Sequence, residues 1–267
     1  MCAALKCLPK WMARSVLLPL SVSFMAPVWA VQEVRVGAAH FPPYIVHPER
    51  GGDIGLLQQL LSAMNQLQPD YHFIVVPTSL ARRVRDFDQG RVDLTFFECE
   101  CWGWKGVDYE SVDLGLEDSE VFVAKQQPGR DQTYFDDVSG KRMALFTGYH
   151  YAFADFNLAP AYLINTFNAT LTYSHKSNLQ MVLRGRVDIT LLTRSNLTDI
   201  LRRNPQYRSR VLMSERVDQF YHHRAFVRRQ GPINAEELVR LLNTLRDNGQ
   251  FKAIFAPYNI KLVATQE

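Results

Sequence analysis

Acidic residues are absent from the first 30 positions, where three basic residues precede an apolar run from Val16 to Trp29 that ends at Ala30. A basic start, an apolar middle and a small-residue end are the three parts of a secretory signal peptide. Two prolines interrupt the run, and a membrane-spanning helix needs roughly 20 apolar residues. We therefore expect residues 1–30 to be a signal peptide cleaved after Ala30, rather than a membrane anchor, and the mature chain to be periplasmic.

Long apolar runs are missing from the rest of the chain, and so is a phosphate-binding P-loop. The mature chain is therefore expected to have no membrane span and no nucleotide-driven transport activity of its own. A surplus of positive charge is missing too, because the signal peptide takes three basic residues and leaves 27 of each sign. Since nucleic-acid binders carry a one-sided positive field, no nucleic-acid partner is expected.

Cysteine is scarce, and two of the four cysteines lie within the expected signal peptide. Cys99 and Cys101 remain, separated by one residue. A disulfide across that spacing closes a very tight ring, and extended neighbours would point to opposite faces of a strand. A structural zinc site normally has four ligands with wider spacing. We therefore expect two thiols, reduced or open to oxidation, and neither a metal nor a cofactor.

Strand and helix patterns alternate along the mature chain. Short apolar segments bounded by turn residues predict strands, whereas apolar residues that recur every three or four positions predict helices. The expected strands are 33–39, 71–76, 92–97, 141–146, 171–173 and 187–192. The expected helices are 56–67, 79–89, 149–156, 177–184, 195–203, 234–246 and 251–258. This alternation with short connections predicts an α/β fold with parallel strands covered by helices.

A four-residue sequence occurs twice. Gly90-Arg91-Val92-Asp93 and Gly185-Arg186-Val187-Asp188 each follow an amphipathic helix and open an apolar strand. The pair suggests two lobes of similar design, although four common residues can also repeat by chance.

Five features together carry a resemblance to a known family. They are the loop Phe41-Pro42-Pro43-Tyr44, the glycines Gly52 and Gly55 before a helix, the first Gly-Arg-Val-Asp copy, the segment 138–149, and Asn248–Phe251 with Tyr258. In this order and spacing they resemble the periplasmic solute-binding protein family 3, the group similar to the amino-acid-binding proteins of ABC transporters. The matching features run from about residue 33 to residue 260.

The resemblance implies a two-lobed periplasmic-binding-protein fold (type II), with a ligand cleft between lobes joined by two hinge strands. Lobe 1 is expected to comprise 31–122 and 218–267, and lobe 2 to comprise 123–217. The hinge strands are expected near 121–125 and 214–228. In such sheets the ligand lies beyond the carboxyl ends of the strands.

The residues at the family's recognition positions depart from its pattern. Lys105 stands where amino-acid-binding members have the arginine that grips the ligand carboxylate, and lysine lacks the bidentate fork of arginine. Thr193 replaces the acidic residue that holds the ligand ammonium. The run 97–101 replaces small hydroxyl residues. The resemblance therefore implies a ligand other than a standard α-amino acid.

We expect the ligand-binding residues to be aromatic or polar side chains at strand ends and loops facing the cleft: Phe41, Tyr44, Arg82, Phe97, Glu98, Glu100, Lys105, His150 and Thr193. A carboxylate in a partly dry cleft needs a positive partner. For Glu98 and Glu100 that partner is either a cationic ligand or an internal cation, namely Arg82, Lys105 or Arg194. His150 is expected at the start of a helix, where backbone N–H groups suit an anionic or polar ligand group.

The function implied is binding without catalysis. The monomeric protein would capture an amino-acid-like molecule, an amine or an organic acid by hinged closure, and deliver it to an ABC-type permease encoded separately. Two alternatives share the scaffold. One is a sensor domain that feeds a signalling partner. The other is an enzyme similar to cyclohexadienyl dehydratase, in which Glu98 or Glu100 would act as a general acid–base.

Overall fold

The computed structural model describes residues 30–51 and 54–265, so the expected signal peptide, apart from Ala30, lies outside the described residues. The chain divides into two units, 1–30 and 31–267, and the second carries the whole described fold. None of the described helices is both long and apolar enough to cross a membrane.

One mixed sheet runs through the 31–267 unit in the order β2-β1-β3-β8-β4-β7-β5-β6, and β9 pairs with β4. Parallel pairing joins β1 to β2 and β3, and β5 to β6 and β7, whereas β4 and β8 pair antiparallel with their neighbours. The strands are β1 (Gln32–Ala38), β2 (Tyr71–Pro77), β3 (Leu94–Glu98), β4 (Glu110–Lys125), β5 (Met143–Phe146), β6 (Ala169–Thr172), β7 (Ile189–Thr193), β8 (Val211–Val227) and β9 (Lys261–Leu262).

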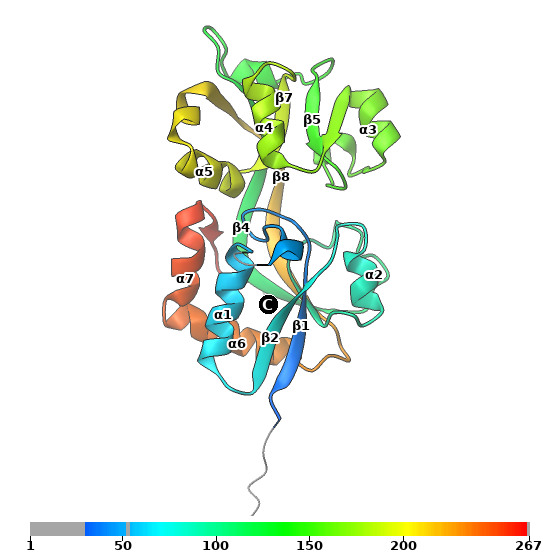
Figure 1. Ribbon diagram of the computed structural model, residues 1–267, viewed down its shortest axis with the longest axis vertical. Coiled ribbons are helices and arrows are strands. Elements are labelled where there is room, and N and C mark those ends of the chain that lie inside the picture. The colour runs from blue at the N-terminus through cyan, green and yellow to red at the C-terminus, as the bar shows by residue number, and fades with distance from the viewer. Residues whose placement is uncertain (1–29, 52–53, 266–267) are drawn as a thin grey trace, which may run out of the picture. The chain divides into compact units, whose positions relative to one another are not determined.

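Two lobes share this sheet (Figure 1). Lobe 1 contains β1 to β3 with α1 (Leu56–Leu67), α2 (Arg83–Asp88), α6 (Ala235–Asp247) and α7 (Gln250–Phe255). Lobe 2 contains β5 to β7 with α3 (Pro160–Phe167), α4 (His175–Leu183) and α5 (Arg194–Arg203). Short 3-10 helices occur at Pro48–Arg50, Gln132–Phe135, Ala152–Ala154, Pro205–Arg210 and Ala256–Tyr258.

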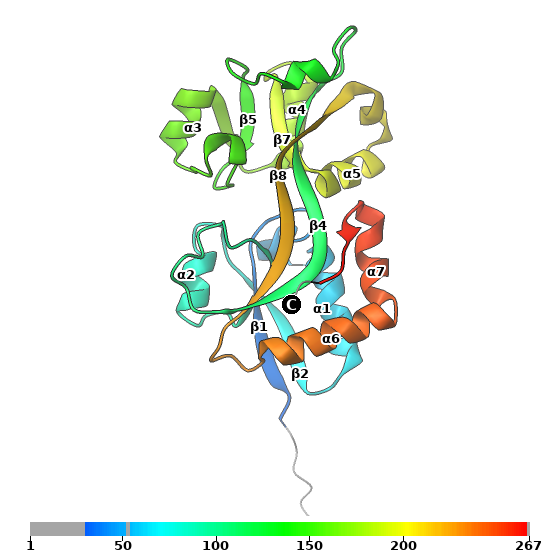
Figure 2. The same ribbon diagram turned by 180° about the vertical axis from the view of Figure 1, so that it is seen from behind.

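The long strands β4 and β8 cross from one lobe to the other side by side (Figure 2). They form the two hinge strands expected from the sequence, although β4 begins eleven residues before the expected 121. The expected lobe boundaries at 122/123 and 217/218 both fall within these strands, and they stay a prediction.

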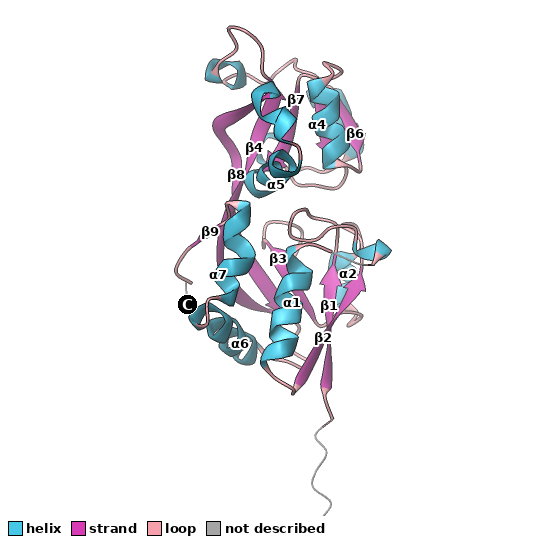
Figure 3. Ribbon diagram, turned by 60° about the vertical axis from the view of Figure 1, so that its left-hand side comes forward, coloured by secondary structure: helices cyan, strands magenta, loops and turns pink. Residues whose placement is uncertain are grey.

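Burial of one apolar face places α1 in lobe 1. Its stripe Leu56, Leu57, Leu60, Leu61 and Met64 is buried, as the spacing predicted. Burying each such side chain contributes about 1.5–3 kcal/mol relative to leaving it in water. The helix lies beside α7 against the sheet (Figure 3).

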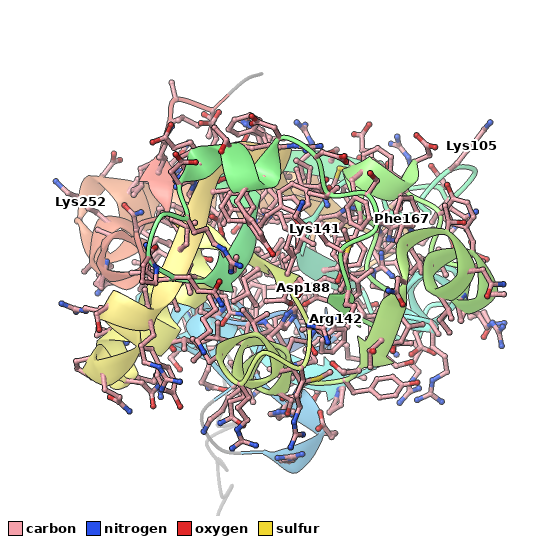
Figure 4. The ribbon with its side chains drawn as sticks, turned by 90° about the horizontal axis from the view of Figure 1, so that it is seen from above. Lys105, Lys141, Arg142, Phe167, Asp188 and Lys252 are labelled. Carbon is pink, nitrogen blue, oxygen red and sulfur yellow. A yellow bond between two sulfur atoms is a disulfide. The ribbon has the colours of Figure 1, made fainter. Side chains whose placement is uncertain are left out.

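The repeated Gly-Arg-Val-Asp sequence has the same structural role in both lobes. In lobe 1, Arg35 donates to both oxygens of Asp93, from Nε at 2.8 Å and from Nη2 at 2.7 Å. In lobe 2, Arg142 donates to both oxygens of Asp188, from Nε at 3.0 Å and from Nη2 at 2.9 Å (Figure 4). Each pair locks one strand to the turn that opens the next. The repeat therefore reflects a shared design.

The expected helix 149–156 is wrong, because only Ala152–Ala154 forms a 3-10 turn. Asp155 and Phe156 adopt left-handed backbone conformations, which end that turn. The sequence also did not indicate α3. The helix α4 begins earlier than expected, since Ser174 rather than Ser177 caps it.

Candidate functional site

A pocket lies between the two lobes beside the hinge, with about 580 Å³ of atom-free space including its open mouth. Lobe 1 contributes the ends of β1 and β3, the loops that follow β1, β2 and β3, and the start of α2. Lobe 2 contributes the loop after β5, and the hinge contributes Tyr221 of β8. The lining residues are Gly37, Ala39, Phe41, Ile45, Thr78, Leu80, Arg83, Thr95, Phe96, Phe97, Glu98, Trp102, Gly148, Tyr149, His150 and Tyr221.

A buried ion pair forms one part of the lobe 1 wall. Arg83 Nε lies 3.3 Å from the Glu98 carboxylate, and the two side chains are 8% and 9% exposed. Arg83 also donates to the carbonyls of Leu80 and Trp102, both at 2.7 Å, while Trp104 Nε1 donates to Glu98 at 3.0 Å. The pair is thus held from both sides by groups of the protein itself.

Aromatic rings form much of the remaining wall. Phe41 makes edge-on contacts with the rings of Trp102, Tyr149 and Tyr221, at centroid distances of 5.6, 5.8 and 6.1 Å. Trp102 also meets Tyr221 at 5.1 Å. Because these rings come from lobe 1, lobe 2 and the hinge, a ligand that touches them would touch all three parts.

His150 lies on the lobe 2 wall, in an irregular loop rather than at a helix start. Burial, with a smaller effect from Arg83, lowers the pKa of His150 to about 4, so its ring is neutral at pH 7. The backbone N–H groups of the nearby turn are already taken, because Asp218 accepts from Ala152 N at 2.9 Å and from Phe153 N at 2.8 Å. The expected anion site at this turn is therefore occupied by a carboxylate of the protein.

Two carboxyl groups lie behind the pocket in the hinge. Glu120 is fully buried and accepts from Tyr221 Oη at 2.6 Å and from Gln219 Nε2 at 3.0 Å. Burial raises the pKa of Glu120 to about 8. Asp118 accepts from Tyr44 Oη at 2.9 Å and from Ser195 Oγ at 2.5 Å, and burial raises its pKa as well. Tyr44 and Tyr221 thus tie lobe 1 and the pocket to the hinge.

Four of the residues predicted from the sequence line the pocket: Phe41, Phe97, Glu98 and His150. Whether these contact a ligand stays a prediction. Glu98 is paired with a cation of the protein, which is one of the two alternatives given from the sequence. The cation is Arg83, however, and not Arg82, Lys105 or Arg194.

The other five predicted residues lie elsewhere. Tyr44 is fully buried against Asp118, and Thr193 is buried at the start of α5. Arg82 is exposed at the start of α2, and Glu100 is exposed with its nearest cation, Arg224, at 3.9 Å. Lys105 is exposed and points outward at the edge of the protein (Figure 4).

Cys99 and Cys101 form a disulfide, with Cα atoms 5.2 Å apart. The expectation of two reduced thiols is therefore wrong, and the cysteines take the oxidised state that the sequence left open. Strand β3 ends at Glu98, so the cysteines lie in a turn where the alternation of a strand does not apply; Trp102 N donates to Cys99 O at 3.0 Å across it. The disulfide lies between two residues of the pocket wall, Glu98 and Trp102.

Sequence reasoning missed Arg83, Tyr149 and Tyr221 as pocket residues, and Glu120 behind them. Tyr221 and Glu120 carry one signal that could have found them, since each lies in or next to an expected hinge strand. Arg83 had no such signal, because it differs from Arg82 only in the direction that its side chain takes from the first turn of α2.

Thr193 has a structural role that can be measured. Its Oγ1 accepts from Asn196 N at 3.1 Å and so caps α5. We expect Thr193→Ala to lower the free energy of unfolding by about 1 kcal/mol, because the cap is lost. Thr193→Ser keeps the capping hydroxyl and loses only a buried methyl group, so it should lose less stability than Thr193→Ala. Urea denaturation of both variants checks this, and equal losses would refute the capping role.

No protein-family model matches the sequence, and no curated protein matches it. Solved structures do match. A mutant of ArgBP from T. maritima superposes with a TM-score of 0.63 at 17% identity, covering 85% of this chain and 94% of that one. A histidine kinase sensor domain similar to periplasmic binding proteins gives 0.61 at 20% identity, covering 85% and 95%.

A third structure is an ancestral amino-acid-binding protein, AncCDT-1, described as a precursor of cyclohexadienyl dehydratase. It gives a TM-score of 0.61 at 15% identity and covers 85% of this chain and 94% of that one. At these identities the likeness establishes the fold, which is the two-lobed α/β periplasmic-binding-protein fold (type II).

Proposed function

We propose that this chain is a periplasmic solute-binding protein, a divergent member of the solute-binding protein family 3. It would capture a small polar molecule by closing its lobes and present that molecule to an ABC-type permease encoded separately. The observation that carries the proposal is the pocket itself, whose wall is shared by lobe 1, lobe 2 and the hinge strand β8. A ligand drives closure only if it contacts both lobes, and this wall allows that.

The same geometry argues against a standard α-amino acid as the ligand. Lys105, at the carboxylate-binding position of the family, is exposed away from the pocket, and Thr193, at the ammonium-binding position, caps a helix. Neither is among the residues that line the pocket.

Thermal melting against a panel of solutes tests the proposal. A ligand at 100 times its Kd stabilises the protein by about 2.7 kcal/mol, and for a domain of this size that raises Tm by roughly 5–10 °C. Small-angle scattering should show a smaller radius of gyration with the same compound.

Tyr149→Ala should weaken binding, whereas Tyr173→Ala, a change at a tyrosine outside the pocket, should not. A panel with no stabilising compound would contradict the transport proposal.

The dehydratase alternative has support from the fold that this chain shares with AncCDT-1. Against it, Glu98 is paired with Arg83 and Glu100 is exposed, so neither stands free in the pocket. Turnover of prephenate or arogenate, measured by product analysis, would favour the enzyme over the binding protein.

A further inference from the structure

Among the residues that the structure describes, two charged side chains line the pocket, Arg83 and Glu98. They are paired with each other at 3.3 Å and are less than a tenth exposed. The remaining bonds of both groups go to the protein: Arg83 to two carbonyls, and Glu98 to the indole of Trp104. The charges of the wall therefore cancel.

Two neighbouring titratable groups, His150 and Glu120, add no charge at pH 7, while Asp118 behind the wall is held by hydrogen bonds from Tyr44 and Ser195 and is not among the lining residues. His150 is neutral, since burial lowers its pKa to about 4, and Glu120 is protonated, since burial raises its pKa to about 8. A charged ligand would either stay unpaired in a partly dry pocket or have to break the Arg83–Glu98 pair. Both carry a desolvation penalty that an uncharged ligand avoids.

The wall also offers flat surface and unused hydrogen-bonding groups. The rings of Phe41, Trp102, Tyr149 and Tyr221 surround the pocket with apolar faces and edges. Two lining residues carry hydrogen-bonding atoms, Thr95 Oγ1 and Trp102 Nε1, that have no partner among the described residues. Both atoms are buried beneath the surface of the wall, so a ligand would reach them through a shift of these side chains. An indole N–H can only donate, so its partner must be an acceptor.

We infer that the pocket takes a flat, uncharged molecule, aromatic or heteroaromatic, that carries at least one carbonyl-type acceptor. The acceptor would bind the hydroxyl of Thr95 or the indole N–H of Trp102, and the ring would lie among the aromatic side chains. The inference rests on the proposed function and narrows its ligand, because it excludes amines and organic acids in their ionised forms.

Three compounds with one ring and different charges test it: benzamide, benzoate and benzylamine. Ligand-observed NMR titration of the full-length protein at pH 7 gives a Kd for each. We expect benzamide to bind at least tenfold more tightly than benzoate and benzylamine. Equal or tighter binding of either ion overturns the inference, and so does the absence of binding by all three.

Variants test the two arguments separately. Glu98→Gln leaves the charge of Arg83 uncancelled, so the preference for benzamide over benzoate should fall at least tenfold; an unchanged preference overturns the charge argument. Thr95→Val should weaken benzamide binding about fivefold without lowering the Tm of the ligand-free protein, because a methyl group replaces a buried hydroxyl that has no partner. Thr95→Ser keeps the hydroxyl and should retain benzamide binding. If Glu98→Gln fails to fold, the benzamide affinities of Thr95→Val and Thr95→Ser still test whether the ligand binds in this pocket.

The outcomes also separate this inference from the proposed function. If a charged compound from the solute panel lowers the radius of gyration, the proposed solute-binding function is supported and the inferred uncharged ligand is wrong. If benzamide binds as expected but no solute contracts the protein, the pocket chemistry stands and the transport proposal is wrong.

Discussion

Replacing Arg83 by methionine is expected to lower the free energy of unfolding by about 3–5 kcal/mol. The change removes the cation beside Glu98, which is 7% exposed and would keep only the hydrogen bond from Trp104. An unpaired carboxylate in such surroundings is far costlier than a well-packed neutral group. Urea denaturation at pH 7, analysed by linear extrapolation, measures the loss.

Arg82 supplies a matched control for this prediction. It is the neighbouring arginine and is exposed, so Arg82→Met should change the stability by no more than about 0.5 kcal/mol. The double variant Arg83→Met with Glu98→Gln removes both charges and should recover most of the loss. Similar losses for the two single arginine variants would mean that the Arg83–Glu98 pair does not stabilise the fold.

The adjacency of these two arginines shows where prediction from the sequence stopped. The helix around them was expected from residue 79, but α2 begins at Arg83, and the residues before it form turns. Successive side chains on a helix differ by about 100° in direction, so an error of one residue exchanges a buried position for an exposed one. Apolar periodicity identifies an element well, but it does not tell which polar residue at the end of the element turns inward.

The elements themselves were predictable because their signals are local. The stripe of α1 and the apolar strands β1, β3 and β7 depend on neighbours along the chain, and the structure confirms them within a few residues. The disulfide joins residues two positions apart and depends on the turn that follows β3, whereas the hydrogen bond between Tyr221 and Glu120 in the hinge depends on contact between distant segments. Glu120 and Tyr221 are 101 positions apart, so nothing in either local pattern indicates that they meet.

Replacing Glu120 by glutamine is expected to remove a contribution that lowers the stability of the parent protein as the pH rises from about 6.5 to 8. Burial, with smaller effects from Asp218 and Asp118, raises the pKa of Glu120 from its ordinary 4.5 to about 8. The native state therefore holds a proton that the unfolded chain releases above pH 4.5. Stability from this group is fully present below pH 4.5 and is lost as the pH rises to about 8.

Two buried histidines, His175 and His223, and two half-buried ones, His40 and His150, act in the opposite direction on the acid side. Burial lowers their pKa values from 6.5 to about 4 for His40 and His150, and to about 3 for His175 and His223. Their neutral forms are favoured in the native state, so their contribution is present above pH 6.5 and is lost as the pH falls below it. Between pH 6.5 and 8 the histidines of the unfolded chain finish losing their protons, which raises stability and offsets the fall from Glu120. The contribution of Glu120 is therefore read from the difference between the parent and Glu120→Gln.

The expected difference in slope between the parent protein and Glu120→Gln in that window is about −1.4 kcal/mol per pH unit, or roughly 2 kcal/mol over the whole window. Glutamine cannot release a proton and keeps an acceptor for Tyr221. Glu120→Gln should therefore lose the contribution of Glu120 to the pH dependence of stability and keep that of the histidines. Glu117→Gln is the matched control, because Glu117 lies on the same strand with a side chain 40% exposed, and it should retain the slope. Urea denaturation at half-unit pH steps measures all three proteins. If the stability of Glu120→Gln depends on pH as that of the parent does, or if Glu117→Gln shows the same change as Glu120→Gln, then Glu120 does not keep its proton in the folded hinge.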